Sequence, residues 1–241
     1  MVTLCLDFGN TRCKAALFDK DALQKTLVLK NGGAGEIEAL LSANRPERSI
    51  LSSVIDHAEE IEELLSRKTV FHRLSHNSNL PFTIPVGKPE TVGADRLAIL
   101  AGSVFQFPEQ NRLSIGLGSC ITYNFINQAN EFLGGAISPG MEMRFRAMNQ
   151  FTARLPLVQG QWNVPLIGYD TKTNLQTGVV MGMVKEMDGF IEAYAERYGN
   201  FNALLTGGDL PLFEPHLKSK IFADPDLIFK GLYAISQINN A

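Results

Sequence analysis

Short apolar runs alternate with segments of helical periodicity along most of the chain. Runs of β-prone residues bounded by turn residues predict strands at 2–6, 12–18, 26–29, 49–54, 70–74, 113–117, 121–126, 132–137 and 203–205. Apolar positions at helical spacing predict helices at 37–41, 59–65, 92–105, 141–151, 174–198 and 227–238. Strands interspersed with helices throughout the chain indicate the α/β class.

The opening of this pattern occurs twice. A strand–turn–strand–turn–strand segment at 2–29 is matched by a second one at 113–137. The sequence identity between them is slight, so the repeat is one of pattern. We therefore expect two similarly built α/β halves, residues 1–109 and residues 110–241, with a boundary near 108–112.

Composition narrows the classes of protein that fit this pattern. The 241 residues are 45% hydrophobic and 20% charged, which suits a packed core and excludes an intrinsically disordered chain. A formal net charge of −3 supplies no basic field for nucleic acid or anionic membrane. Three cysteines suit a reducing compartment, and no leader-like or membrane-length apolar run is present. We expect a soluble cytoplasmic protein without a nucleic-acid or membrane partner.

The most informative segment follows the first predicted strand and runs from Asp7 to Lys14. An Asp at the end of an apolar strand is costly to bury without a partner, and a divalent cation or its waters would supply one. Gly9 allows a tight turn, after which Asn10 and Thr11 offer donors suited to phosphate oxygens. These features favour a phosphate-binding loop over the alternative, a simple hairpin with solvated Asp and Lys side chains.

A second candidate segment, Gly93-Ala94-Asp95-Arg96, enters the helix predicted at 92–105. Asp in a first helical turn is favoured by the helix dipole, and by itself this segment is better explained as a cap. The catalytic alternative makes Asp95 a general base on a substrate hydroxyl. Arg96 would then hold a carboxylate or phosphate through its fork of donors.

The second strand opening carries similar turn chemistry. The segment from Gly116 to Thr122 contains glycine and a small hydroxyl residue between two predicted strands, as the first turn does. Two such loops facing each other across a cleft would grip a polyphosphate, whereas a tight hairpin is the plain alternative. Gly134-Gly135 and Pro139-Gly140 would either shape a floor under a ligand or serve as turn and helix-start residues.

In order and spacing, these motifs resemble the type III pantothenate kinase family over about residues 2–210. Each motif alone is weak, but the ordered set is specific. The resemblance implies an actin-like (hexokinase superfamily) ATPase fold, with two ribonuclease-H-like domains of mixed sheets and helices and a nucleotide cleft between them. It also implies a homodimer. The motifs are Asp7-x-Gly9-Asn10-Thr11-x-x-Lys14, Gly93-x-Asp95-Arg96, Gly118-Ser119-Cys120-x-Thr122 and Gly134-Gly135-x-Ile137-x-Pro139-Gly140.

The same resemblance implies roles for individual residues. Asp95 would be the catalytic base on the pantothenate hydroxyl, and Asp7 would face magnesium through water. ATP phosphates would be bound by Asp7, Gly9, Asn10, Thr11, Lys14 and Ser119, the last in place of a family Thr. Pantothenate would be bound by Gly93, Ala94, Asp95, Arg96 and Thr171, which precedes Asn174-Leu175-Gln176-Thr177-Gly178.

The chain also departs from the family pattern at three positions. Gly116 stands where the family has an Asp that contacts a monovalent cation, K⁺ or NH₄⁺, and Asn124 stands where a further Asp is common. Val86 replaces a Tyr that helps to enclose pantothenate. We therefore expect the monovalent-cation site to be altered.

Three hypotheses remain open from the sequence. The leading one is ATP- and magnesium-dependent phosphorylation of pantothenate to 4′-phosphopantothenate, the first step toward coenzyme A. The departures at Gly116, Asn124 and Val86 motivate a second, a non-catalytic binding or regulatory relative. The third is a kinase of the same superfamily that acts on another small hydroxy compound.

Overall fold

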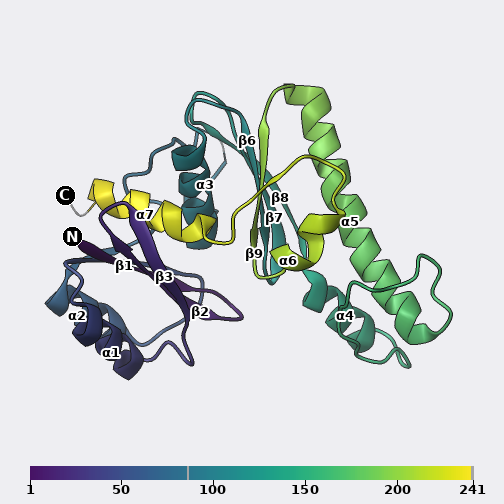
Figure 1. The fold of residues 1–241 in the computed structure, drawn as a ribbon, viewed down its shortest axis with the longest axis horizontal. Coiled ribbons are helices and arrows are strands. Elements are labelled where there is room, and N and C mark those ends of the chain that lie inside the picture. The colour runs from purple at the N-terminus through teal and green to yellow at the C-terminus, as the bar shows by residue number, and fades with distance from the viewer. Residues whose placement is uncertain (86, 240–241) are drawn as a thin grey trace. The chain divides into compact units, whose positions relative to one another are not determined.

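The computed structural model describes residues 1–85 and 87–239, which form two compact units. The first unit comprises residues 1–109, 126–133 and the segment that begins at 226, and the second comprises 110–125 and 134–225. Each unit is built around one five-stranded sheet (Figure 1).

The first sheet has the strand order β3-β2-β1-β4-β5. β1 pairs antiparallel with β2 and parallel with β4, and β4 pairs parallel with β5, so the sheet is mixed. The predicted opening of strand, turn, strand, turn and strand is confirmed. The strands are β1 (Val2–Phe8), β2 (Cys13–Asp19), β3 (Ala22–Val28), β4 (Arg48–Ser53) and β5 (Val70–Arg73).

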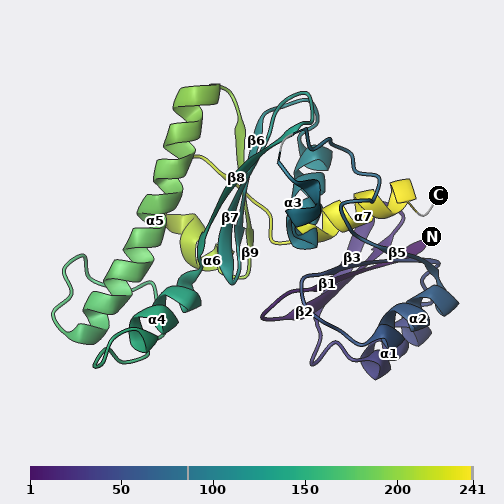
Figure 2. The ribbon, with the colours of Figure 1, turned by 180° about the vertical axis from the view of Figure 1, so that it is seen from behind.

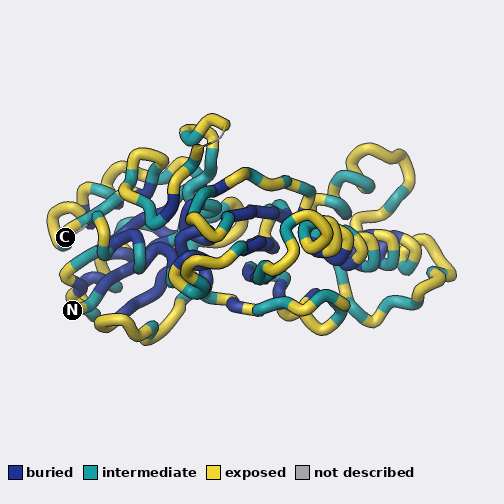
Figure 3. The backbone as a smooth tube through the Cα atoms, turned by 90° about the horizontal axis from the view of Figure 1, so that it is seen from above, coloured by how far each residue is buried: buried dark blue, intermediate teal, exposed yellow. Residues whose placement is uncertain are grey.

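Helices cover both faces of the first sheet (Figure 2). Side chains alternate along β1, so Leu4, Leu6 and Phe8 share a core with α1 (Ala34–Asn44) and α2 (Glu59–Lys68). Cys5 lies in the core of the opposite face, which is formed with α3 (Ala94–Gln106) and α7 (Leu227–Asn239). Buried residues accordingly concentrate in the strands near the N-terminus (Figure 3).

The second sheet has the order β10-β9-β6-β7-β8, with β6 at its centre. β6 is buried along its whole length, and after Arg112 it consists of small and apolar residues, as a strand covered on both faces requires. The long helix α5 contributes most helical residues to the core of this unit. The elements are β6 (Arg112–Leu117), β7 (Cys120–Ile126), β8 (Phe132–Pro139), α4 (Met141–Gln150), α5 (Thr171–Tyr198), β9 (Asn202–Gly207), α6 (Leu210–Phe213) and β10 (Phe222–Ala223).

Each strand and helix expected from the sequence overlaps an observed element, and the α/β class is confirmed. The sequence did not predict the short elements α6, β10 and two 3₁₀ turns, Pro89–Thr91 and Glu214–His216. Such elements contain too few residues to develop a periodic pattern. Within the described residues, no helix has the length and apolar character needed to cross a membrane.

The compact units differ from the expected halves, residues 1–109 and 110–241, in two segments. Residues 126–133 and the helix α7 belong to the first unit. α7 buries its apolar face against α3, and glycines allow their backbones to approach closely. A Cβ at Gly231 would lie 1.8 Å from the carbonyl oxygen of Ala98, and one at Gly102 would lie 2.3 Å from that of Leu227. Hydrophobic periodicity predicted α7 itself but not its partner.

Candidate active site

The predicted phosphate loop is the turn of a tight hairpin in the first unit. The Gly9 amide donates to the carbonyl oxygen of Arg12 at 3.1 Å, which leaves Asn10 and Thr11 at an exposed tip. Asp7 pairs with Lys14 across the two strands. The segment therefore does form the hairpin that was the alternative to a phosphate-binding loop. This hairpin places the acidic Asp7, the basic Lys14 and the exposed turn residues at one end of the sheet.

Asp7, the one carboxylate of this segment, lies in an unusual environment for a charged group. Its position in β1 directs it to the same face as Cys5, toward α3. Its Oδ1 atom is buried and accepts no hydrogen bond within the described part of the chain. Burial and, to a smaller extent, the charge of Asp95 together raise the pKa of Asp7 from 3.8 to about 7, although Lys14 and the Ser52 hydroxyl act in the opposite direction.

Ser52 is a residue of this site that the sequence analysis missed. It is the parallel neighbour of Asp7 on β4, and its hydroxyl lies close enough to the Asp7 carboxylate to lower the pKa of that group. Parallel strands have their carboxyl ends at the same edge of a sheet. The polar end of the predicted strand at 49–54 could therefore have indicated Ser52 as a neighbour of Asp7. Recognising Ser52 required the register between β1 and β4, which the sequence does not specify.

Asp95 and Arg96 occupy the first turn of α3, with Gly93 as the N-cap residue and Ala94 as the first helical residue. One carboxylate oxygen of Asp95, Oδ1, accepts from the Arg96 backbone amide at 2.8 Å. The Arg96 guanidinium lies 5.7 Å from the centre of the Phe132 ring. Burial lowers the pKa of Arg96 from its ordinary value, and Asp95 opposes that shift.

The first unit thus brings Asp7 and Asp95 close enough for their charges to interact. Asp95 is not the N-cap residue of α3 and makes no capping hydrogen bond within the described residues, and its bond from the Arg96 amide uses only one of its two carboxylate oxygens. Two neighbouring carboxylates, one with a buried unpartnered oxygen, suit Mg²⁺, which usually takes one or two protein carboxylates and completes its shell with water and phosphate. Within residues 1–85 and 87–239, no cluster of three His, Cys, Asp or Glu side chains offers a full protein cage.

Ser119 lies in the second unit, in the turn between β6 and β7. The Gly118 amide donates to the carbonyl oxygen of Cys120 at 3.1 Å, and the Gly140 amide donates to that of Ser119 at 3.0 Å. The turn is therefore held by the start of α4. A Cβ at Gly140 would lie 2.3 Å from the Gly118 carbonyl oxygen, so this contact requires glycine.

Neutral groups occupy the two positions where the family pattern has carboxylates. Gly116 lies inside the central strand β6. Asn124 is fully buried, and its Nδ2 donates to the Ser114 carbonyl oxygen at 3.3 Å and to Thr122 Oγ1 at 3.2 Å. Val86, the third departure, lies outside the described residues.

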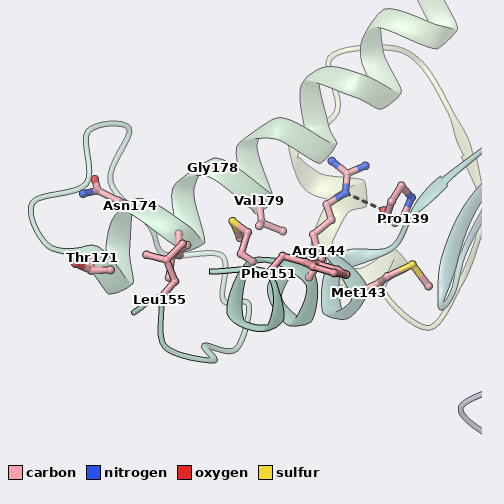
Figure 4. Close-up of a pocket in the computed structure, with 12 residues that line it drawn as sticks. Pro139, Met143, Arg144, Phe151, Leu155, Thr171, Asn174, Gly178 and Val179 are labelled. Carbon is pink, nitrogen blue, oxygen red and sulfur yellow. Dashed lines mark hydrogen bonds between the residues drawn. The ribbon is translucent and has the colours of Figure 1, made fainter. Parts of the chain in front are cut away.

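Thr171 is the first residue of α5, directly after the N-cap residue Asp170. Asp170 and Thr173 form a capping box, which fixes the helix start. Thr171 lines a groove of about 1010 Å³ that α4 and α5 form with the segment following α4 (Figure 4). Apolar side chains dominate the groove, and Arg144 also lines it, with its Nε donating to the Pro139 carbonyl oxygen at 2.8 Å.

Comparison with known proteins assigns the chain to a family. The family model described as type III pantothenate kinase matches residues 3–193. The chain belongs to the type III pantothenate kinase family. The type III pantothenate kinase of Flavobacterium psychrophilum is 37% identical over 236 residues, covering 97% of this chain and 98% of the relative. That of Bacteroides fragilis is 38% identical over 240 residues, covering 99% of each.

Solved structures with lower sequence identity share the fold. A putative Baf family transcriptional activator from Campylobacter jejuni aligns with a TM-score of 0.61 at 22% identity over 97% of both chains. A putative 2-dehydro-3-deoxygalactonokinase from Sinorhizobium meliloti aligns with a TM-score of 0.58 at 12% identity over 98% of both chains. Together with a glucokinase at a TM-score of 0.52, these likenesses confirm the predicted actin-like ATPase fold.

Proposed function

We propose that this protein transfers the γ-phosphoryl group of ATP to pantothenate and forms 4′-phosphopantothenate, the first step toward coenzyme A. Membership of the type III pantothenate kinase family carries this proposal. The arrangement of Asp7 beside Asp95 in the first unit supports it, because phosphoryl transfer needs positioned acid and base groups and little covalent chemistry from the protein.

In this proposal Asp95 is the general base. Its carboxylate would accept the proton of the pantothenate hydroxyl as the oxygen attacks the γ-phosphorus, while Gly93, Ala94 and Arg96 hold the substrate. The half-buried Arg96 guanidinium remains a cation that suits the carboxylate of pantothenate. Thr171 would contact the substrate from the start of α5.

ATP would be held by the hairpin turn and by the second turn. Lys14 and the exposed Asn10 and Thr11 would donate to phosphate oxygens, with Gly9 providing the turn and Ser119 donating from the other loop. Asp7 would face Mg²⁺ through water, and the cation would supply charge neutralisation for the phosphates. A positive ion beside Asp7 also offsets the mutual repulsion of Asp7 and Asp95.

The decisive test is the product of the purified protein with ATP, Mg²⁺ and pantothenate. We expect 4′-phosphopantothenate, and we expect Asp95→Asn to lower kcat by about 10²- to 10⁴-fold, as the loss of a general base does. Glu38→Gln, which neutralises an exposed carboxylate on α1 of the same unit, is the matched control and should leave kcat unchanged. Near-normal turnover of Asp95→Asn would remove the general-base assignment.

The same assay separates the alternatives. Binding of ATP or pantothenate without turnover would favour a regulatory relative. Turnover of a different hydroxy compound from a substrate panel would favour another kinase of the superfamily. Neither alternative is favoured by a contact or burial feature of the described residues.

Monovalent-cation dependence forms a separate prediction. Gly116 and Asn124 provide no negative charge near β6 and β7, and Asn124 is already hydrogen-bonded. We therefore expect turnover in Na⁺ buffer to differ little from turnover in K⁺ or NH₄⁺ buffer at equal ionic strength. Strong activation by K⁺ would show that other groups form the cation site.

We also propose a cytoplasmic homodimer. Large apolar side chains are exposed in and beside the α4–α5 groove: Phe151 lines it, and Leu166, Ile167 and Tyr169 lie in the segment that leads to Thr171, another lining residue. Extended apolar surface of this kind marks an interaction site more often than a solvated face. A second copy of this chain is the partner that the family resemblance implies.

A further inference from the structure

His57 lies in the loop between β4 and α2 and uses both nitrogens of its ring. Nδ1 is 3.0 Å from Ser53 Oγ, and Nε2 is 2.9 Å from Glu62 Oε1. The side chain is only 8% exposed. Nothing in the sequence patterns singled out this residue, because its partners lie four residues before it and five residues after it on different elements.

The hydrogen bonds of His57 can be assigned from what each partner is able to do. Ionised Glu62 only accepts, so Nε2 carries a hydrogen. Ser53 Oγ lies 2.9 Å from the Ile55 carbonyl oxygen, which also only accepts. Ser53 Oγ therefore donates to the Ile55 carbonyl oxygen and also lies within hydrogen-bond distance of His57 Nδ1.

The charges around the ring hold this arrangement in place. Arg73 Nη1 on β5 lies 2.9 Å from the same Glu62 oxygen that receives His57. Glu62 on α2 therefore has two cationic or donor partners, and the chain Ser53–His57–Glu62–Arg73 ties β4, its loop, α2 and β5 together. These are the charged groups that contact the ring or its partner directly.

The β4–α2 loop, which the hydrogen bonds of His57 hold, contacts the end of β1 and the start of α3, the two segments that carry Asp7 and Asp95. The His57 ring meets the Phe8 ring edge-on, with centroids 5.7 Å apart. The Val54 amide donates to the Phe8 carbonyl oxygen at 3.0 Å, next to Asp7. Val54 Cγ1 lies 3.8 Å from the point where a Cβ on Gly93 would stand, two residues before Asp95.

We propose that His57 is a positioning residue that holds the β4–α2 loop, and through it the end of β1 and the start of α3, in the geometry that phosphoryl transfer requires. This inference rests on the proposed function for its catalytic consequence. Among the contacts of the described residues, His57 touches neither Asp7 nor Asp95 directly. It acts through Phe8 and Val54, whose positions set where the two carboxylates stand.

Two substitutions at His57 distinguish hydrogen bonding from packing. His57→Phe keeps an aromatic ring against Phe8 but removes both hydrogen bonds, and His57→Gln keeps an amide donor for Glu62. We expect kcat/KM of His57→Phe to fall by roughly 10- to 100-fold, the range found for outer-shell partners of functional groups. The loss should appear in kcat and in the KM for ATP, and His57→Gln should recover most of it.

His72 provides the matched control. It is a partly buried histidine of the same unit and lies on the edge strand β5. Its Nε2 lies 2.8 Å from Ser78 Oγ. His72→Phe also removes a histidine–serine hydrogen bond, but it does not touch Phe8 or Gly93 in the described contacts. Its kinetic constants should match those of the wild-type protein. Thermal unfolding of all variants shows that each is folded at the assay temperature.

Affinity for Mg·ADP, measured by calorimetry, is the second readout and does not depend on turnover. We expect His57→Phe to bind Mg·ADP about tenfold more weakly than wild type, with His57→Gln in between. Wild-type kinetics in His57→Phe, or equal losses in the Phe and Gln variants, would overturn the positioning role. A wild-type protein that binds Mg·ADP but does not phosphorylate pantothenate would overturn the proposed function alone, and the affinities would still test His57.

Discussion

At the scale of single residues, Asp7 lowers the stability of the folded protein but is suited to its proposed role beside Mg²⁺. Its buried Oδ1 has no partner within the described residues, and Asp95 adds a second negative charge nearby. A buried unpaired carboxylate lowers the stability of a folded protein. Such a group is understandable where a cation and a phosphate are bound during the reaction, because they supply the missing partners.

This cost has a measurable dependence on pH. The folded protein holds a proton on Asp7 up to about pH 7, whereas the unfolded chain releases it near the ordinary pKa of 3.8. Between these values the folded state binds more protons, so the contribution of Asp7 to stability falls as pH rises and stays low above pH 7.

Asp7→Asn should therefore be more stable than the wild-type protein by an amount that grows from pH 5 to pH 8, on the order of a few kcal/mol. Urea unfolding in magnesium-free buffer measures it, with the exposed Asp56→Asn as control. The same variant should lose turnover, because it lacks the anionic oxygen proposed for Mg²⁺. A constant difference between Asp7→Asn and wild type across pH would contradict the raised pKa.

At the scale of elements, the turn between β6 and β7 depends on its contact with the start of α4. The Gly140 amide donates to the Ser119 carbonyl oxygen, and carbonyl oxygens of Gly118 and Ser119 fill the space where a side chain would start. The Pro139-Gly140 pair, considered from the sequence as either a ligand floor or a helix start, is the helix start. In that position it also supports the turn that carries Ser119.

Gly140→Ala should destabilise the protein by about 1–3 kcal/mol, the range for forced backbone shifts in packed regions, and should raise the KM for ATP by displacing Ser119. Gly182→Ala is the control, because Gly182 lies in α5 with no atom within 4 Å of the Cβ position. Alanine there should raise stability by up to about 1 kcal/mol through helix propensity. Equal melting temperatures for Gly140→Ala and the wild-type protein would refute the contact.

At the scale of the whole molecule, the exposed apolar residues around the α4–α5 groove predict self-association. Phe151 is 82% exposed and Ile167 is 83% exposed in the single chain, an unfavourable arrangement for a solvated monomer. Thr171 lines the same groove, so a partner seated there would lie beside a residue proposed to contact pantothenate.

Phe151→Glu should abolish the proposed self-association in sedimentation-velocity measurements at micromolar concentration, because it places a charge in an apolar contact. Phe105→Glu is the matched control, since Phe105 is 61% exposed on α3 in the first unit. We expect that variant to sediment as the wild-type protein does. A Phe151→Glu protein that remains dimeric would place the interface elsewhere.

The sequence alone determined the α/β class, every long strand and helix, and the family, because these depend on local periodicity and on motifs that lie close together in the chain. It also proposed Asp7, Asp95 and Arg96 as candidate site residues, since glycine turns beside charged residues are local features. Only the tertiary structure showed that α7 completes the first unit, that Ser52 adjoins Asp7, and that His57 links Ser53 to Glu62. These depend on strand register and on helix packing, which bring together residues whose spacing in the chain carries no pattern.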